Sequence, residues 1–266
     1  MYYSPIQEEP YYRDKTKEFN RHLTRAYGFM AGGLAITFLV ALLMAYFFPQ
    51  TALNPTVAIV LAVVEIVTVI AFSATLTRAS YGATLGMFLF YSLLNGASIS
   101  YIFLYYDLNK VFYCFAAAAI SFAIMAILGH TTKRELSGFL GLFIAGLFGL
   151  LFLTVIGFFL KSSALEIVIA CIGLILFLGI TAFDAQRLRR FYESASEDDA
   201  FARKFAVYSA LQLYLDFINI FFWFFAWFLF FNRTTFYLWI LSTFLCCNVF
   251  LGFCTLSCSH CTTYYQ

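Results

Sequence analysis

Charged residues are scarce in this sequence, at 11% of 266 residues, while hydrophobic residues make up 63%. Soluble globular domains carry about 25% charged residues, so this composition excludes an ordinary soluble protein. Proline is also rare, and the long apolar runs lack the alternation of apolar and polar residues that marks a transmembrane β-barrel. The net charge of +2 is too small to indicate a nucleic-acid partner. We therefore predict an all-α membrane protein embedded in a lipid bilayer.

Signatures of soluble enzymes are missing as well. The sequence contains no GxSxG, P-loop or HExxH motif, so we expect neither an enzyme nor an organic cofactor. The first 25 residues are polar and of mixed charge, without the apolar core of a secretory signal. We expect residues 1–25 to form a cytoplasmic amino-terminal segment.

Cysteine is present but unevenly placed. Five of the seven cysteines lie in the last 21 residues, and Cys114 and Cys171 stand alone in apolar runs. The segment Cys258–Ser259–His260–Cys261 has metal-binding residue types, but no second CxxC or His pair at zinc-finger spacing accompanies it. We expect residues 234–266, a hydrophobic cysteine-rich extension, to be accessory to the fold.

Long apolar runs define the predicted architecture. Seven of them reach the length of about 18–25 residues that crosses a bilayer as a helix, and an eighth, Phe236–Phe253, is a candidate further span. The links between the runs are short, so we predict one seven-helix membrane domain over residues 26–233. The seven predicted spans are Ala26–Phe48, Ala52–Ala74, Tyr81–Leu104, Val111–Leu128, Gly138–Leu160, Ala164–Asp184 and Phe205–Phe231.

Lysine and arginine are divided unequally between the two ends of these spans. Thirteen of the 16 fall on the side of the amino terminus, and only Lys110, Lys161 and Arg233 fall on the other. Because positively charged loops stay in the cytoplasm, we predict a cytoplasmic amino terminus, with the link Ala185–Lys204 on the same side.

Two carboxylates interrupt the last two predicted spans. Asp184 lies in the sixth span and Asp216 in the seventh, and each acid costs about 2.5–3.5 kcal/mol to insert. Side by side in a low dielectric the two cannot both ionise cheaply, so we expect the pair to titrate as one unit. Their oxygens also suit a hard cation such as Ca²⁺. Counted along the helices, Asp216 is expected to lie deeper in the membrane than Asp184.

Both aspartates have neighbours along their own helices. Asp184 lies one turn before Arg187, and a simpler interpretation of this acid is an interfacial ion pair with that arginine. Asn219 follows Asp216 by three residues on the same helical face, where it can add an amide oxygen or a hydrogen bond.

Glu65 is a third acid inside an apolar run, near the middle of the second predicted span. Two interpretations stay open for it: a buried hydrogen bond, for example to Asn95 or Ser98, or a place on an ion pathway. Arg78 lies at the predicted cytoplasmic end of the same span.

Three segments carry a resemblance to a known family. They are residues 131–139 (TTKRELSGF), 181–188 (TAFDAQRL, around Asp184) and 213–221 (LYLDFINIF, around Asp216). On charge alone the first is a cytoplasmic turn, whereas the last is highly specific. Together they resemble the Bax inhibitor-1 (TMBIM) family, over about residues 20–233, and most closely its bacterial inner-membrane branch.

The resemblance implies both a fold and a function. The implied fold is a seven-helix bundle in which the seventh helix is central and the other six surround it. The implied function is a pH-sensitive calcium leak channel gated by an aspartate pair, which falls on Asp184 and Asp216, with Ca²⁺ as the transported or bound ion. Arg78 is the candidate for the family's arginine latch, displaced by about half a helical turn from the expected position. The implied location is the bacterial inner (plasma) membrane.

Two other classes of function stay open. One is a membrane protein that modulates other proteins, such as cell-death factors or membrane proteases, without transporting ions. The other is an intramembrane aspartyl protease, which also places one aspartate on each of two consecutive spans. Such proteases carry Gly-x-Gly-Asp and a later Pro-Ala-Leu turn, whereas here Leu213–Tyr214–Leu215 precede Asp216 and no proline follows Pro55. Both differences count against a protease.

Overall fold

The computed structural model describes residues 8–75, 79–160, 162–194 and 199–229, and every regular element in these ranges is helical. Three elements are single turns: α2 (Pro49–Ala52), α5 (Ile102–Tyr105) and the 3₁₀ turn η1 (Leu136–Phe139). The long helices are α1 (Glu8–Phe47), α3 (Pro55–Thr75), α4 (Tyr81–Ile99), α6 (Leu108–Thr131), α7 (Leu140–Leu160), α8 (Ser163–Ser194) and α9 (Asp199–Leu229).

Seven segments of this structure are long and apolar enough to cross a membrane. The prediction of an all-α bundle with seven spans is therefore confirmed, and the chain is a multi-pass membrane protein. The segments are Asn20–Phe47, Pro55–Ser73, Tyr81–Tyr105, Leu108–Thr131, Leu136–Gly157, Ala164–Arg190 and Arg203–Trp227.

Local sequence explains where several helices begin. Prolines at Pro49 and Pro55 open α2 and α3, because a first-turn residue needs no backbone N–H partner. Ser80 caps α4: its hydroxyl accepts a hydrogen bond from the Ala83 N–H at 3.3 Å. Asn54 accepts one from the Thr56 N–H at 2.9 Å at the start of α3.

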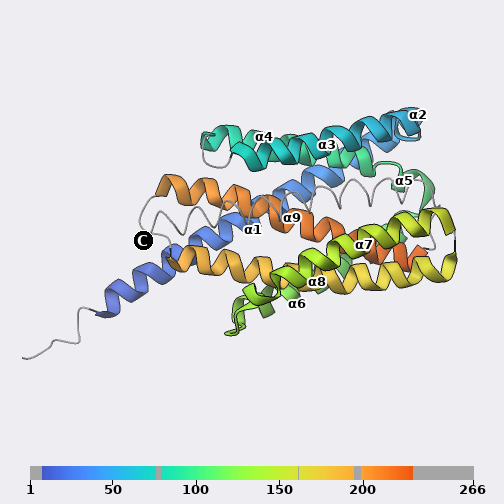
Figure 1. Ribbon diagram of the computed structural model, residues 1–266. Helices are drawn as coiled ribbons and strands as arrows, with labels where there is room; N and C mark the ends of the chain where they lie inside the picture. The colour runs from blue at the N-terminus through green and yellow to red at the C-terminus, as the bar shows by residue number, and fades with distance from the viewer. Residues whose placement is uncertain (1–7, 76–78, 161, 195–198, 230–266) are drawn as a thin grey trace, which may run out of the picture.

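The last long helix, α9, is the core of the bundle. In its most apolar stretch of 18 residues, 94% of the residues are buried, against 17–50% in the corresponding stretches of the six other spans. The pair α3 and α4 lies on one side of α9, and α7 and α8 lie on the other (Figure 1). The expectation of a central seventh span is thus confirmed. Many side chains of the other helices face outward, as expected where lipid rather than water surrounds the protein.

Glycines allow close helix contacts at several points. A methyl group at Gly96 of α4 would lie 2.6 Å from the Thr37 carbonyl oxygen of α1. One at Gly129 of α6 would overlap the backbone carbonyl of Ala182 in α8. The second contact lies two residues from Asp184 and sets how closely α6 approaches α8.

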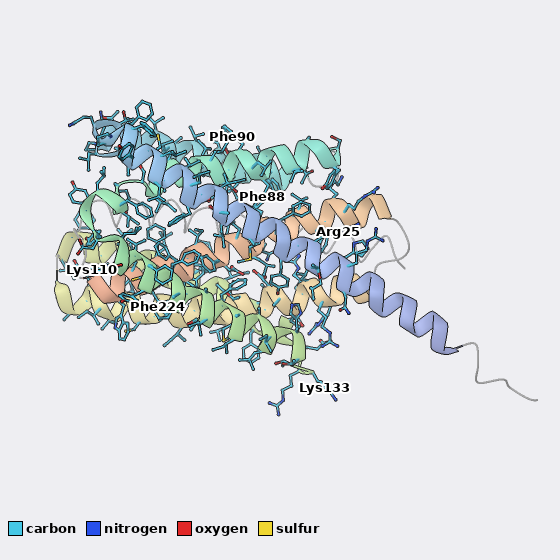
Figure 2. The ribbon with its side chains drawn as sticks, turned by 180° about the vertical axis from the view of Figure 1, so that it is seen from behind. Arg25, Phe88, Phe90, Lys110, Lys133 and Phe224 are labelled. Carbon is cyan, nitrogen blue, oxygen red and sulfur yellow. The ribbon has the colours of Figure 1, made fainter. Side chains whose placement is uncertain are left out.

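The positive charges gather at one end of the bundle, which we call the basic end. Arg25 and Lys133 lie at this end and Lys110 at the other (Figure 2). The predicted link Ala185–Lys204 between the sixth and seventh spans was too long, because α8 continues as a helix to Ser194 and α9 begins at Asp199. Asp184 is therefore inside a continuous helix and not at its end. The added helical turns carry charged residues and lie beyond the apolar candidate spans, so an apolar count does not detect them.

Some predictions fall outside the described residues. They concern Arg78, the eighth apolar run Phe236–Phe253 and the cysteine-rich extension 234–266 with its Cys258–Cys261 segment. The assignment of residues 1–25, 26–233 and 234–266 to separate units stays a prediction.

Candidate functional site

The structure brings Asp184 of α8 and Asp216 of α9 together inside the bundle. Their side chains are 4% and 1% exposed, and they are hydrogen-bonded to each other. A carboxylate can only accept hydrogen bonds, so this contact requires a proton on one of the two groups. The two carboxyl groups therefore lie within hydrogen-bonding reach of each other, whereas a count of residues along the helices placed Asp216 deeper than Asp184.

One carboxyl oxygen of each aspartate lacks a hydrogen-bond partner in the described part of the chain. Among the described residues, neither Asp184 Oδ1 nor Asp216 Oδ2 has a hydrogen-bond partner, although both atoms are buried. A buried acceptor without a donor is costly, and such atoms are rare in folded proteins. Two of them converging on one pair mark a place where a proton, a water or a cation would be stabilised.

Polar groups from three helices face the pair. Arg187, one turn further along α8, and Gln212 of α9 both interact with Asp184. Tyr27 of α1 lies within electrostatic reach of Asp216. Arg187 therefore lies within electrostatic reach of Asp184, and the interfacial ion pair between them stays a prediction.

Asp184 opens into a small pocket between α8 and α9. The cavity volume is about 10 Å³, which is the space of about one water molecule. A cation with its hydration shell does not fit in this space. The other walls of the pocket are Arg187, Leu188, Phe205, Ser209, Gln212 and Leu213.

A tyrosine–histidine contact joins α1 to α6 beside the pair. The Tyr27 hydroxyl lies 2.8 Å from His130 Nε2, and the two rings meet edge to face with centroids 5.9 Å apart. His130 Nδ1 is buried and has no hydrogen-bond partner among the described residues. Neither residue was singled out from the sequence, because an isolated tyrosine or histidine near a span end carries no distinctive pattern.

The segment 132–136, between α6 and α7, is fastened to α8 by one glutamine. Gln186 Nε2 donates to the carbonyl oxygens of Thr132 and Arg134 at 3.1 and 2.7 Å. Its Oε1 accepts from the Leu136 N–H at 2.9 Å. Gln186 is 4% exposed and follows Asp184 by two residues, so the turn is held at the level of the site.

Two arginines of α8 extend this attachment. Arg190 donates to Gln186 Oε1 at 2.5 Å and lies 3.6 Å from the Glu135 carboxylate. Arg189 donates to the backbone carbonyl of His130. The segments 131–139 and 181–188, both quoted above for the family resemblance, are therefore in direct contact through Gln186.

Glu65 of α3 is buried in a separate polar cluster. It is 1% exposed and accepts a hydrogen bond from the Ser98 hydroxyl at 2.6 Å, so one of its two predicted partners is present. The other, Asn95, is fully buried, and neither of its amide atoms has a hydrogen-bond partner among the described residues. Tyr214 lies within electrostatic reach of Glu65, and its hydroxyl is 2.6 Å from that of Thr37 in α1.

Asn219 is buried, and its side-chain amide is hydrogen-bonded within α9. Its Nδ2 donates to the Leu215 carbonyl oxygen of its own helix at 2.7 Å, and its side chain is 2% exposed. The amide nitrogen is therefore engaged by α9 itself. Sequence reasoning passed over Gln212, which lies one turn before Asp216, although an uncharged amide in an apolar span carries the same kind of signal as a buried acid.

Comparison with known proteins agrees with this architecture. A family model described as "Inhibitor of apoptosis-promoting Bax1" matches residues 19–234. Inner membrane protein YbhL of Escherichia coli K12 is 36% identical over 204 residues, covering 75% of this chain and 87% of the relative. A membrane protein of Streptococcus pyogenes serotype M1 is 32% identical over 207 residues, covering 76% and 89%. A protein of Borreliella burgdorferi is 30% identical over 212 residues, covering 76% and 88%. The chain therefore belongs to the Bax inhibitor-1 family.

Proposed function

We propose that this protein is a pH-sensitive calcium leak channel of the membrane, gated by the Asp184–Asp216 pair. The observation that carries the proposal is the contact between two buried carboxyl groups on adjacent spans, each with an unpartnered oxygen. A pair built only for stability would have its acceptors satisfied, or would be replaced by apolar residues at little cost.

The chemistry of the pair supplies a gate. With both groups ionised, the site carries two negative charges in a low dielectric and attracts a cation, either a side chain or Ca²⁺. With protons bound, that attraction is weakened. Protons and Ca²⁺ compete for the same oxygens, so acidification weakens Ca²⁺ binding while it loosens whatever cation holds the gate shut.

Arg187 is a candidate for the cation that holds the gate shut. It lines the pocket beside Asp184 and interacts with that carboxylate. Since the pocket has room for about one water molecule, cation entry requires the arginine and the adjoining side chains to move. Arg78, for which the family resemblance implies a latch, lies outside the described residues and stays a second candidate for this role.

The proposed orientation places the amino terminus and the basic end in the cytoplasm, in keeping with the positive-inside rule. Ca²⁺ would then pass between the far side of the bundle and the pocket at the cytoplasmic end of α8 and α9. The relatives include a protein named for the bacterial inner membrane, and we propose the same location for this chain.

Reconstitution tests the proposal against a non-transporting regulator. Purified protein in liposomes loaded with a Ca²⁺ indicator should raise Ca²⁺ influx above that of empty liposomes, and more at pH 6 than at pH 8. Asp216→Asn should lower the influx and remove its dependence on pH. Influx equal to that of empty liposomes at both pH values would favour the regulator.

A further inference from the structure

The α6–α7 turn, residues 132–136, carries a dibasic pair that the proposed gate does not use. Lys133 and Arg134 are exposed, and neither side chain has a hydrogen-bond or ion-pair partner among the described residues. Lys133 projects from the turn away from the bundle (Figure 2). Two adjacent cations without a partner in this part of the protein are available to an anion outside it.

The neighbouring acid does not neutralise the dibasic pair. Glu135 follows Arg134 in the turn, but its carboxylate lies 3.6 Å from Arg190 of α8. Arg189 is engaged as well, because it donates to the backbone carbonyl of His130. Since Arg190 balances the charge of Glu135, the charges of the dibasic pair remain uncompensated.

The backbone that carries the dibasic pair is held in one conformation by α8. Gln186 donates to the carbonyl oxygens of Thr132 and Arg134 and accepts from the Leu136 N–H, so both ends of the turn are fixed. A segment that is ordered before it binds loses less conformational entropy on binding. The turn therefore presents its two cations in a preformed arrangement.

Apolar side chains border the turn on both sides. Ile127 and Leu128 lie near the end of α6, Phe139 and Leu142 follow the turn, and these four side chains are 47–65% exposed. All four belong to segments that are long and apolar enough to cross a membrane, so they face lipid. The turn thus lies where the hydrocarbon of the bilayer gives way to the headgroups. A molecule that places an anion on the dibasic pair can extend acyl chains along the same surface.

We propose that the α6–α7 turn is a binding surface for an anionic phospholipid, with Lys133 and Arg134 on its phosphate and the bordering apolar side chains along its acyl chains. Charge complementarity selects this occupant, because the cytoplasmic leaflet carries anionic lipids and each Lys or Arg near its surface contributes to binding. Both side chains are common ligands of phosphate groups. The inference does not depend on the proposed channel activity, since it requires only that the basic end lie at a membrane surface.

Lipid binding to the purified full chain tests the proposal. Native mass spectrometry in detergent compares the affinity for phosphatidylglycerol with that for phosphatidylcholine of the same acyl chains. The variant Lys133→Gln/Arg134→Gln removes both cations, and because the two side chains are exposed it should fold normally. The matched control, Arg21→Gln/Arg203→Gln, removes two exposed positive charges from α1 and α9.

We expect the unmodified protein to bind phosphatidylglycerol more tightly than phosphatidylcholine. Lys133→Gln/Arg134→Gln should weaken phosphatidylglycerol binding by about 25-fold, as for the loss of two contributions of about fivefold each. The control variant should lose much less, because charges away from the bound headgroup are screened. Inorganic phosphate in excess should not displace the lipid, since it has no acyl chains to bury.

Three results would overturn the inference. Equal affinities of the unmodified protein for the two lipids would refute a site for anionic phospholipid. Equal losses in the two double variants would reduce the effect to the general charge of the basic end. Displacement of phosphatidylglycerol by inorganic phosphate would assign the turn to a soluble anion instead of a lipid.

Discussion

Individual polar side chains carry most of the information about function in this protein. Asp184, Asp216 and Glu65 can all be picked out from sequence, because a charged group in an apolar span is expensive and rare. Their partners are predictable only in part. Ser98 was one of two predicted partners of Glu65. The attachment of Gln186 to the α6–α7 turn was not predicted, because it depends on which helix faces lie together, and one sequence does not specify that.

Thr37 offers a test of polar contacts between helices. Its hydroxyl meets the Tyr214 hydroxyl at 2.6 Å and also bonds to Gly33 and Ser92 carbonyl oxygens. Thr37→Val should lower the free energy of unfolding in detergent by about 0.6–1.7 kcal/mol, the range for interhelical hydrogen bonds in membranes. Thr154→Val is the matched control, because its hydroxyl bonds only within its own helix, to Leu150, among the contacts of the described residues. Equal losses in the two variants would refute a special role for the Thr37 contact.

At the scale of elements, sequence predicts the spans well and their ends poorly. The runs of apolar residues place all seven spans within a few residues, yet α8 and α9 extend beyond them through charged positions. The same limit affected the expected positions of the aspartates. Counting residues from an assumed helix start put Asp216 deeper, whereas the packing of α8 against α9 brings the two carboxyl groups into contact.

The attachment of the α6–α7 turn to α8 gives a second prediction. Gln186→Met removes the acceptor of the Leu136 N–H and both donors to the turn. We expect the Leu136 amide to exchange with deuterium at least about tenfold faster, as for loss of about 1.4 kcal/mol of local protection. Gln212→Met, the same change on α9, should leave exchange in the turn unaltered. Unchanged exchange in Gln186→Met would mean that the turn is held by other contacts.

A third prediction concerns the close contact of α6 and α8. Gly129→Ala places a methyl group against the Ala182 carbonyl, so the helices must separate beside Asp184. The free energy of unfolding should fall by about 1–3 kcal/mol, as for overpacked interiors. Gly149→Ala in α7, where the added methyl group meets nothing within 4 Å, should be neutral or slightly stabilising. A thermal unfolding series in detergent checks both, and equal stability of the two variants would contradict the packing described.

For the molecule as a whole, the asymmetry of charge predicts one orientation. Glu135 lies at the basic end and Asp107 at the other, and both side chains are 78% exposed. In a cysteine-free background on intact bacterial cells, a membrane-impermeant maleimide should label Asp107→Cys and not Glu135→Cys until the cells are broken. The reverse pattern would invert the topology and place the pocket on the outer side.

The overall fold was also the part most accessible from sequence. Seven spans and a central seventh helix followed from hydropathy and from the family resemblance, because the bilayer limits the choice to helices that satisfy their own backbone. The size of the pocket beside Asp184 did not follow. It depends on packing between Phe205, Leu213 and Arg187, which no pattern along one helix reveals.

The central claim is that Asp184 and Asp216 act as one titrating gate for a cation. Ca²⁺ flux and Ca²⁺ binding measured on the same liposomes between pH 5.5 and 8 test it most directly. As pH falls we predict that flux rises while binding weakens, because protons displace Ca²⁺ from the pair and release the gate. Asp184→Asn and Asp216→Asn should each abolish the pH dependence, and the double variant should add little, as for one coupled unit. A full pH profile like that of the unmodified protein in either single variant would contradict the account.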